Sequence, residues 1–96
     1  MEYRVNLTKE VIKEDLPKLK KSGLNLEILG KKISKLETNP YSNSKAKSGD
    51  LSSIRALNWG DGYRIVLEID ELNKEVNIIS IDKHDNAYKK AKKRVK

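Results

Sequence analysis

The first forty residues alternate hydrophobic and polar positions with two different periods. Apolar side chains occupy every second position over residues 3–7, which predicts a strand with one buried face. Over residues 11–19 and 24–36 they recur every three or four positions, which predicts two amphipathic helices. Asn39-Pro40 ends the second helix. The connection around Gly23 is so short that the two helices are expected to pack as a hairpin.

Pro17 interrupts the pattern of the first predicted helix. Proline lacks an amide hydrogen, and its ring clashes with the preceding turn of a helix. We therefore expect a break or kink near residues 14–17. A fresh helical segment that is capped by Asp15 would place Pro17 in a first turn, where proline is tolerated.

The second half of the chain predicts a loop, three strands and a helix. Residues 41–50 are polar, small and turn-forming. The strand candidates are residues 51–59, 63–70 and 75–81, and the third is apolar on both faces, which is typical of an interior strand. Asp61-Gly62, between the first two strands, is a strong signal for a two-residue hairpin loop. From about residue 85 the chain is expected to be helical and basic.

The hairpin register decides which side chains share a face of the sheet. The apolar positions of residues 63–70 must meet the helices, so Arg64 is expected on the opposite, open face. With a two-residue loop, Arg55, Leu57 and Trp59 share that open face with Arg64. A loop of odd length would reverse this result.

The order of elements predicts one α+β domain. Ninety-six residues are enough for a single core, and the basic C-terminal helix or tail covers about residues 85–96. Cysteine is absent, so disulfides and thiolate metal sites are excluded, and neither a metal nor a cofactor is expected. No apolar run approaches the roughly 20 residues of a membrane span, and no signal peptide is recognisable. A cytoplasmic protein without a membrane partner is the expectation.

The net charge of +7 is concentrated at the C-terminus. The last eight residues hold six of the 21 basic groups and no acidic group, so the rest of the chain holds 15 basic and 14 acidic groups. Such a concentration is typical of a surface that binds a polyanion, although a solvated terminus has the same composition. If the partner is RNA, the candidate contacts are Lys83, Lys89, Lys90, Lys92, Lys93 and Arg94.

Four short motifs resemble the RelE/ParE superfamily of toxins from type II toxin–antitoxin systems. They are Leu-Pro-Lys-Leu at residues 16–19, Asn-Pro at 39–40, Gly-Tyr-Arg-Ile-Val at 62–66 and the ending Ile-Asp-Lys-His-Asp-Asn-Ala-Tyr at 81–88. Their order and spacing extend over nearly the whole chain. The resemblance implies a RelE-like β-α-α-β-β-β(-α) fold, with a helical hairpin packed on one face of a small, mostly antiparallel twisted sheet. RelE-like toxins cut messenger RNA on the ribosome without metal and are neutralised by a cognate antitoxin.

The resemblance also implies candidate catalytic residues. Arg64 stands at the family's strand arginine, and its planar guanidinium suits a phosphate. Arg55, nine positions earlier, stands where a basic residue is common. Tyr88 stands at the C-terminal tyrosine and is a candidate for base stacking or proton transfer.

The sequence departs from the family pattern at two positions. His84, the single histidine, replaces an arginine, and histidine's reference pKa of about 6.5 suits general acid–base work near neutrality. A surface histidine without a catalytic role is the alternative. Leu57 replaces a second basic residue. Arg64 has its own alternative, a structural ion pair with Glu68 or another carboxylate.

Three functions fit these residues. The first is a ribosome-dependent mRNA endonuclease in which a 2′-hydroxyl attacks the adjacent phosphorus without metal. The second is a ParE-like, non-catalytic inhibitor of DNA gyrase, which the losses at Leu57 and His84 favour. The third is an attenuated family member that binds nucleic acid through its basic tail. The expected partners are messenger RNA, the ribosome and a cognate antitoxin in a hetero-oligomer.

Overall fold

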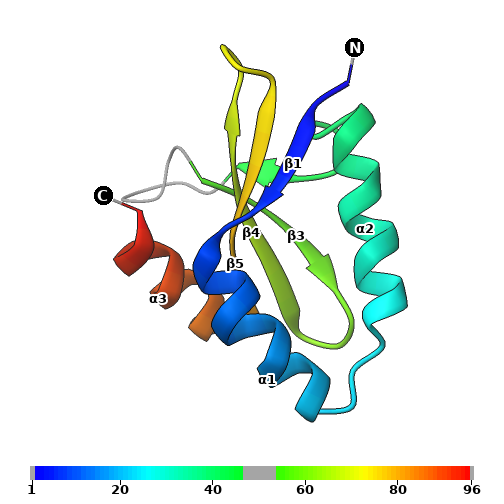
Figure 1. The fold of residues 1–96 in the computed structure, drawn as a ribbon, viewed down its shortest axis with the longest axis vertical. Coiled ribbons are helices and arrows are strands. Elements are labelled where there is room, and N and C mark those ends of the chain that lie inside the picture. Colours follow the sequence, from blue (N-terminus) through cyan, green and yellow to red (C-terminus); the bar gives the residue numbers. More distant parts are fainter. Residues whose placement is uncertain (1, 47–53, 96) are drawn as a thin grey trace.

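The protein is built on one twisted sheet, as the computed structural model shows (Figure 1). The structure describes residues 2–46 and 54–95, which include a five-stranded sheet with the order β1-β5-β4-β3-β2. β1 pairs in parallel with β5, and the other pairs are antiparallel. The strands are β1 (Arg4–Leu7), β2 (Lys45–Ala46), β3 (Arg55–Trp59), β4 (Tyr63–Asp70) and β5 (Glu75–Lys83).

The first helical segment changes its winding where the sequence predicted a break. A short π-helix, η1 (Val11–Asp15), passes directly into α1 (Leu16–Lys21), with Pro17 in the first turn of α1. The π-helix lies directly before Pro17, whose missing amide hydrogen and bulky ring disturb the regular hydrogen bonding of an α-helix. The second helix, α2 (Leu26–Thr38), begins where the Asn25 side chain accepts hydrogen bonds from two amides of the first turn.

The main core lies on the sheet face that α1 and α2 cover. Val11 and Leu19 from the first helical segment and Leu29 and Leu36 from α2 are buried there. They pack on apolar residues of the sheet, namely Trp59, Ile65, Leu67, Val76, Ile78 and Ile81. The prediction of an α+β fold with a helical hairpin on one face of a mostly antiparallel sheet is confirmed.

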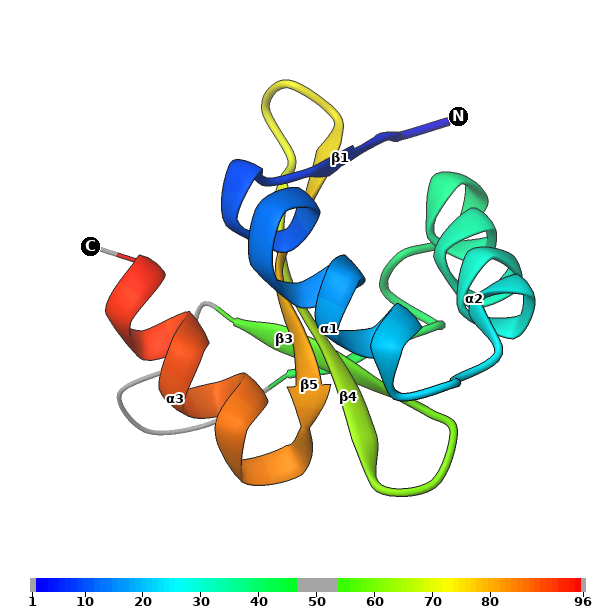
Figure 2. The same ribbon diagram turned by 60° about the horizontal axis from the view of Figure 1, so that its bottom comes forward.

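A smaller core covers part of the opposite face. The last helix, α3 (His84–Arg94), lies on the other side of the sheet from α2 (Figure 2). Its Ala87 and Ala91 are buried against the sheet residues Ile54, Ala56, Val66 and Ile79. The buried Ser80 hydroxyl also donates a hydrogen bond of 2.7 Å to the Ala87 carbonyl oxygen. The face that the sequence predicted to be open is therefore partly covered by α3.

The register of the β3–β4 hairpin differs from the prediction. Trp59 pairs with Tyr63 and Asn58 with Arg64, so the loop comprises the three residues 60–62. Gly62 has φ +82°, a left-handed conformation that glycine adopts without strain and that is common at the end of three-residue loops. Because this odd length reverses the parity of β3, Arg55, Leu57 and Trp59 face the main core. The prediction that they share a face with Arg64 is wrong.

The remaining elements follow the sequence with small shifts. β5 has a neighbour on each side, which confirms the interior position. The segment predicted as a loop contains β2, and residues 47–50 of that loop and 51–53 of the next predicted strand lie outside the described residues. α3 begins at His84, one residue before the predicted start. In the part of the chain that the structure describes, no helix is long and apolar enough to span a membrane.

Candidate functional site

Arg64 lies on the face of β4 that carries α3. Its cross-strand neighbours are Asn58 on β3 and Asp82 on β5, and it is half-buried. The guanidinium Nη1 donates a hydrogen bond of 3.0 Å to the carbonyl oxygen of Tyr63. Within residues 2–46 and 54–95, Arg64 forms no ion pair, so the expected alternative of a structural pair with Glu68 is not observed. Its charge is available to an anion.

His84 and Tyr88 form a pair at the start of α3. Their rings meet edge to face with centroids 5.0 Å apart, as residues four positions apart on a helix can. The backbone N–H of His84 donates to the carbonyl oxygen of Gly62 at 3.0 Å, which ties the helix start to the β3–β4 loop. Nδ1 of His84 lies 3.0 Å from the Asp85 carboxylate, and this contact with the imidazole lowers the pKa of Asp85.

Three of the four predicted catalytic residues therefore gather at one end of the sheet. Arg64 pairs across the sheet with Asp82, which lies near the end of β5 and two residues before His84. Gly62, two residues before Arg64, is bonded to the His84 backbone. Tyr88 packs against the smaller core on this same face.

Arg55 lies apart from this group. Its Nε donates a hydrogen bond of 2.8 Å to the Ser44 hydroxyl, and its Nη2 donates to the carbonyl oxygens of Tyr41 at 3.0 Å and Ser44 at 2.9 Å. The guanidinium also stands 5.1 Å from the centre of the Tyr41 ring. These contacts anchor the segment after α2 on the main-core side, so the four predicted residues do not converge in one patch.

Two of the predicted RNA-binding residues take part in an ion-pair network whose carboxylates are buried. We call this the α3 network, and it consists of Asp15, Lys18, Asp82, Lys90 and Arg94. Lys90 Nζ lies 2.9 Å from Asp15 and 2.7 Å from Asp82. Arg94 contacts Asp15 at 2.9 Å. These contacts fix α3 to the sheet. Exposed positions are occupied instead by the remaining predicted contacts, Lys83, Lys89, Lys92 and Lys93.

The α3 network shifts the pKa values of its members. Burial raises the pKa of Asp82, but hydrogen bonds from Lys90, the Lys83 backbone and Lys18 outweigh burial, so the net shift is downward. Burial lowers the pKa of Lys90, but its bonds to Asp82 and Asp15 outweigh this, and the net shift is upward. Both side chains are therefore held in their charged forms.

Sequence reasoning missed the α3 network, although one signal for it exists. Asp15 lies four residues after Val11 and four before Leu19, so it occupies the buried stripe of the helix. Its carboxylate does not cap α1, as the sequence suggested it could. Instead it accepts a hydrogen bond of 2.9 Å from the Ile81 backbone amide, past the point where β1 ends.

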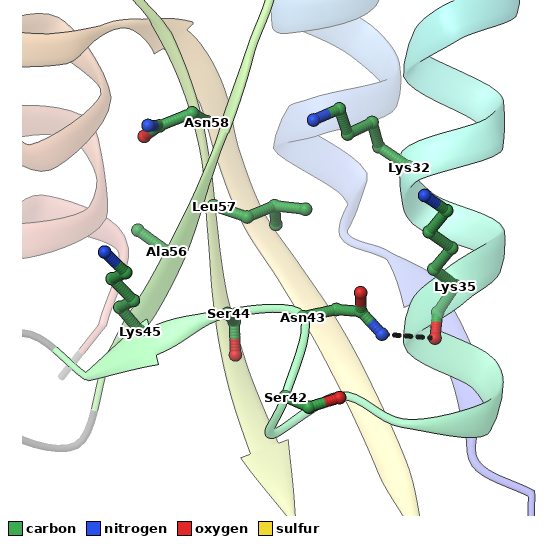
Figure 3. A pocket seen from close by; sticks show the side chains of 9 residues that line it. All are labelled: Lys32, Lys35, Ser42, Asn43, Ser44, Lys45, Ala56, Leu57 and Asn58. Atoms are coloured by element: carbon green, nitrogen blue, oxygen red, sulfur yellow. Dashed lines mark hydrogen bonds between the residues drawn. The ribbon is translucent and has the colours of Figure 1, made fainter.

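A second surface feature that sequence reasoning missed is a basic hollow beside the edge of β3 (Figure 3). It measures about 300 Å³ and lies between α2 and β3. Its lining is Lys32 and Lys35 from α2, Ser42, Asn43, Ser44 and Lys45 from the following segment, and Ala56, Leu57 and Asn58 from β3. The signal in the sequence is the spacing of Lys32 and Lys35, which places both on one side of a helix.

No family model and no curated protein matches this chain, but solved structures do. A mutant of the Escherichia coli toxin RelE in the free state matches with a TM-score of 0.72 at 20% identity, over 100% of both chains. A copper-bound mutant toxin from Helicobacter pylori matches with a TM-score of 0.71 at 21% identity, over 90% of this chain and 98% of the other.

A third match is a chain of the toxin–antitoxin complex RelBE2 from Mycobacterium tuberculosis. Its TM-score is 0.66 at 23% identity, over 88% of this chain and 100% of the other. All three proteins resemble this chain in three-dimensional structure, whereas their sequence identity to it is low. The protein therefore has the fold of the RelE-like toxins, and its function has to be argued from its own residues.

Proposed function

We propose that this protein is the toxin of a toxin–antitoxin pair and that it cuts messenger RNA on the ribosome. Its fold is that of RelE-like toxins, and proteins whose structures it resembles are named as toxins. The observation that carries the proposal is the grouping of Arg64, His84 and Tyr88 at one end of the α3 face. These three side chains can supply a cation, a proton-transfer group and an aromatic ring.

The proposed reaction is attack of a ribose 2′-hydroxyl on the adjacent phosphorus. The 2′-oxygen loses its proton as the new P–O bond forms, and the 5′-oxygen leaves with a proton, so the products are a 2′,3′-cyclic phosphate and a 5′-hydroxyl. Arg64 stabilises the charge that develops on the phosphate oxygens. His84 transfers a proton through Nε2, because Nδ1 lies against Asp85. Tyr88 stacks on a base or helps in proton transfer. The proposed reaction uses neither metal nor cofactor.

The test is cleavage of a defined message on purified translating ribosomes, with the cut positions read by primer extension. Wild-type protein is expected to cut, and Arg64→Ala, His84→Ala and Tyr88→Ala are expected to lose cutting while their circular dichroism stays unchanged. Arg4→Ala is the matched control, since Arg4 is exposed on β1 and pairs with Glu75 at the far end of β5. A 2′-deoxy nucleotide at the cut site must abolish cleavage there. Unchanged cutting by the three variants would refute the site.

A second function, non-catalytic inhibition of DNA gyrase, has one observation in its favour. Arg55 is engaged by the Tyr41–Ser44 segment and Leu57 is neutral, so the Arg64 site has fewer cations than the RelE-like pattern implies. Supercoiling by purified gyrase separates the two functions. The endonuclease leaves supercoiling intact and cuts messages, whereas a gyrase inhibitor blocks supercoiling and leaves messages whole.

We further propose a cognate antitoxin as the protein partner and the cytoplasm as the place of action. One structural neighbour comes from a toxin–antitoxin complex. The net charge of +7 favours an acidic partner segment. Co-expression with the product of an adjacent reading frame should restore growth and yield a hetero-oligomer in gel filtration.

A further inference from the structure

The hollow beside β3 has basic groups on two sides. Lys32 extends from α2 toward β3, Lys35 lies along α2 beside it, and Lys45 lies on β2 across the hollow (Figure 3). We call this feature the lysine groove. It differs from the Arg64 site in its elements, because it is formed by α2, β2 and the outer edge of β3.

Among the residues that the structure describes, the three ammonium groups of the lysine groove have no counter-charge. Across the described ranges, none of Lys32, Lys35 and Lys45 forms an ion pair or side-chain hydrogen bond. The part of the lining that is described contains no carboxylate. Like charges around one concave surface raise the local positive potential, so the groove favours an anion with several charges.

Neutral polar groups complete the lining. The Asn43 amide nitrogen donates to the carbonyl oxygens of Asn39 at 2.8 Å and Lys35 at 3.3 Å, which leaves Asn43 Oδ1 as an acceptor. Ser42 supplies a hydroxyl and Asn58 an amide. Hydroxyl, amide and ammonium groups together are the set that contacts phosphate and sugar in nucleic-acid complexes.

The lysine groove reaches the neighbourhood of Arg64. Leu57 faces the main core, whereas Ala56 and Asn58 face α3, so the groove passes over the edge of β3 from one face to the other. β2 pairs with Arg55 and Ala56, and no described strand flanks the rest of this edge. Asn58 is the direct cross-strand neighbour of Arg64. A chain lying in the groove can therefore continue to the Arg64 site.

We propose that the lysine groove binds the backbone of single-stranded RNA next to the segment that is cut at Arg64. This inference rests on the proposed function as an RNA endonuclease. An acidic extended peptide would also meet positive charge here. The continuity with Arg64 favours RNA. The lining does so too, because an added peptide strand needs pockets for alternate side chains, and among the described lining residues the apolar ones are Ala56 and Leu57.

The test is binding of a labelled, 2′-O-methylated RNA oligomer, which cannot be cut by 2′-hydroxyl attack, measured by fluorescence anisotropy over a range of salt concentrations. The groove variant is Lys32→Gln/Lys35→Gln/Lys45→Gln. The control is Lys20→Gln/Lys21→Gln/Lys31→Gln, which removes the same charge from exposed lysines outside the groove. The slope of log affinity against log salt is expected to fall by about 2 in the groove variant alone, because each phosphate contact contributes about 0.7.

The outcomes separate this inference from the proposed function. If the groove variant loses RNA affinity while wild-type protein never cuts messages, RNA binding by the lysine groove is supported and the proposed endonuclease activity is refuted. If the groove variant binds like wild type, or if both triple variants lose affinity equally, the inference is overturned whether or not messages are cut. A labelled glutamate-rich peptide is the competing probe. Loss of peptide binding with unchanged RNA binding in the groove variant would also overturn it.

Discussion

The carboxylate of Asp15 is completely buried, and three groups from two other elements, β5 and α3, balance its charge. It accepts from the Ile81 amide on β5 and contacts Lys90 and Arg94 on α3. Arg94 also donates a hydrogen bond of 2.9 Å to the Ile79 carbonyl oxygen. Asp15 and Arg94 thus satisfy backbone groups of β5 beyond the end of β1, which would otherwise be exposed as a free strand edge.

Replacing Asp15 with alanine is expected to lower the free energy of unfolding by about 3–5 kcal/mol, because Lys90 and Arg94 lose a buried counter-charge. Urea denaturation followed by circular dichroism measures this. The double variant Asp15→Ala/Arg94→Met should lose less than the sum of the two single variants, since both belong to one network. Additive losses would show that the contacts of Asp15 and Arg94 contribute independently.

Because the pKa of Asp82 is lowered in the folded protein, the stability that the α3 network contributes depends on pH. Its folded-state pKa lies below the usual value, so Asp82 contributes stability above the unfolded pKa of about 3.9 and loses it as pH falls through the folded pKa. Asp82→Asn should lower the melting temperature at neutral pH and weaken the further decline below about pH 4. Thermal melts of both proteins across this range test the effect. Parallel curves for the two proteins would contradict it.

A substitution at Tyr88 can distinguish base stacking by its ring from proton transfer by its hydroxyl. Its ring meets His84 edge to face, which suits a stacking platform at the site. Tyr88→Phe keeps the ring and is expected to retain cleavage within about tenfold, whereas loss of a general acid or base costs about 10²–10⁴-fold. Single-turnover cleavage on ribosomes measures both Tyr88→Phe and Tyr88→Ala. A loss in Tyr88→Phe as large as in Tyr88→Ala would assign proton transfer to the hydroxyl.

At the scale of elements, the β3–β4 hairpin decides the composition of the site. Gly62 needs a left-handed conformation, so Gly62→Ala is expected to cost about 1–2 kcal/mol of stability. Gly30→Ala is the matched control: Gly30 lies inside α2 with open space around it, and alanine there should stabilise by about 0.5–1 kcal/mol. Urea denaturation compares the two. Equal stabilisation by both would contradict the left-handed turn.

The hairpin also shows what the sequence could not decide. Periodicity located β4 and β5, because alternation over many residues leaves one buried face. It could not decide between a two-residue and a three-residue loop at Gly60-Asp61-Gly62, since both place glycine where it is favourable. That single residue moved Arg55 to the opposite face. Arg64, His84 and Tyr88 were found through short motifs, whereas the contacts that Asp15 makes in the α3 network join residues 66 to 79 positions apart.

At the scale of the whole molecule, α3 connects the fold to the proposed activity. Its inner side forms the smaller core and the α3 network, and its first two turns carry His84 and Tyr88. Lys89, Lys92 and Lys93 of α3 are exposed, as is Lys83 just before it. The basic end that the composition indicated is therefore divided: Lys90 and Arg94 hold the helix in place, and the exposed lysines remain candidates for contacts with RNA.

The account's central claim is that Arg64, His84 and Tyr88 make this protein an mRNA-cutting toxin, and mapping of transcript ends in cells after brief induction tests it most directly. Wild-type protein should arrest growth and produce new 5′ ends within translated regions. Arg64→Ala, expressed to the same level, should produce neither. New ends that persist in Arg64→Ala, or growth arrest with intact transcripts, would contradict the claim.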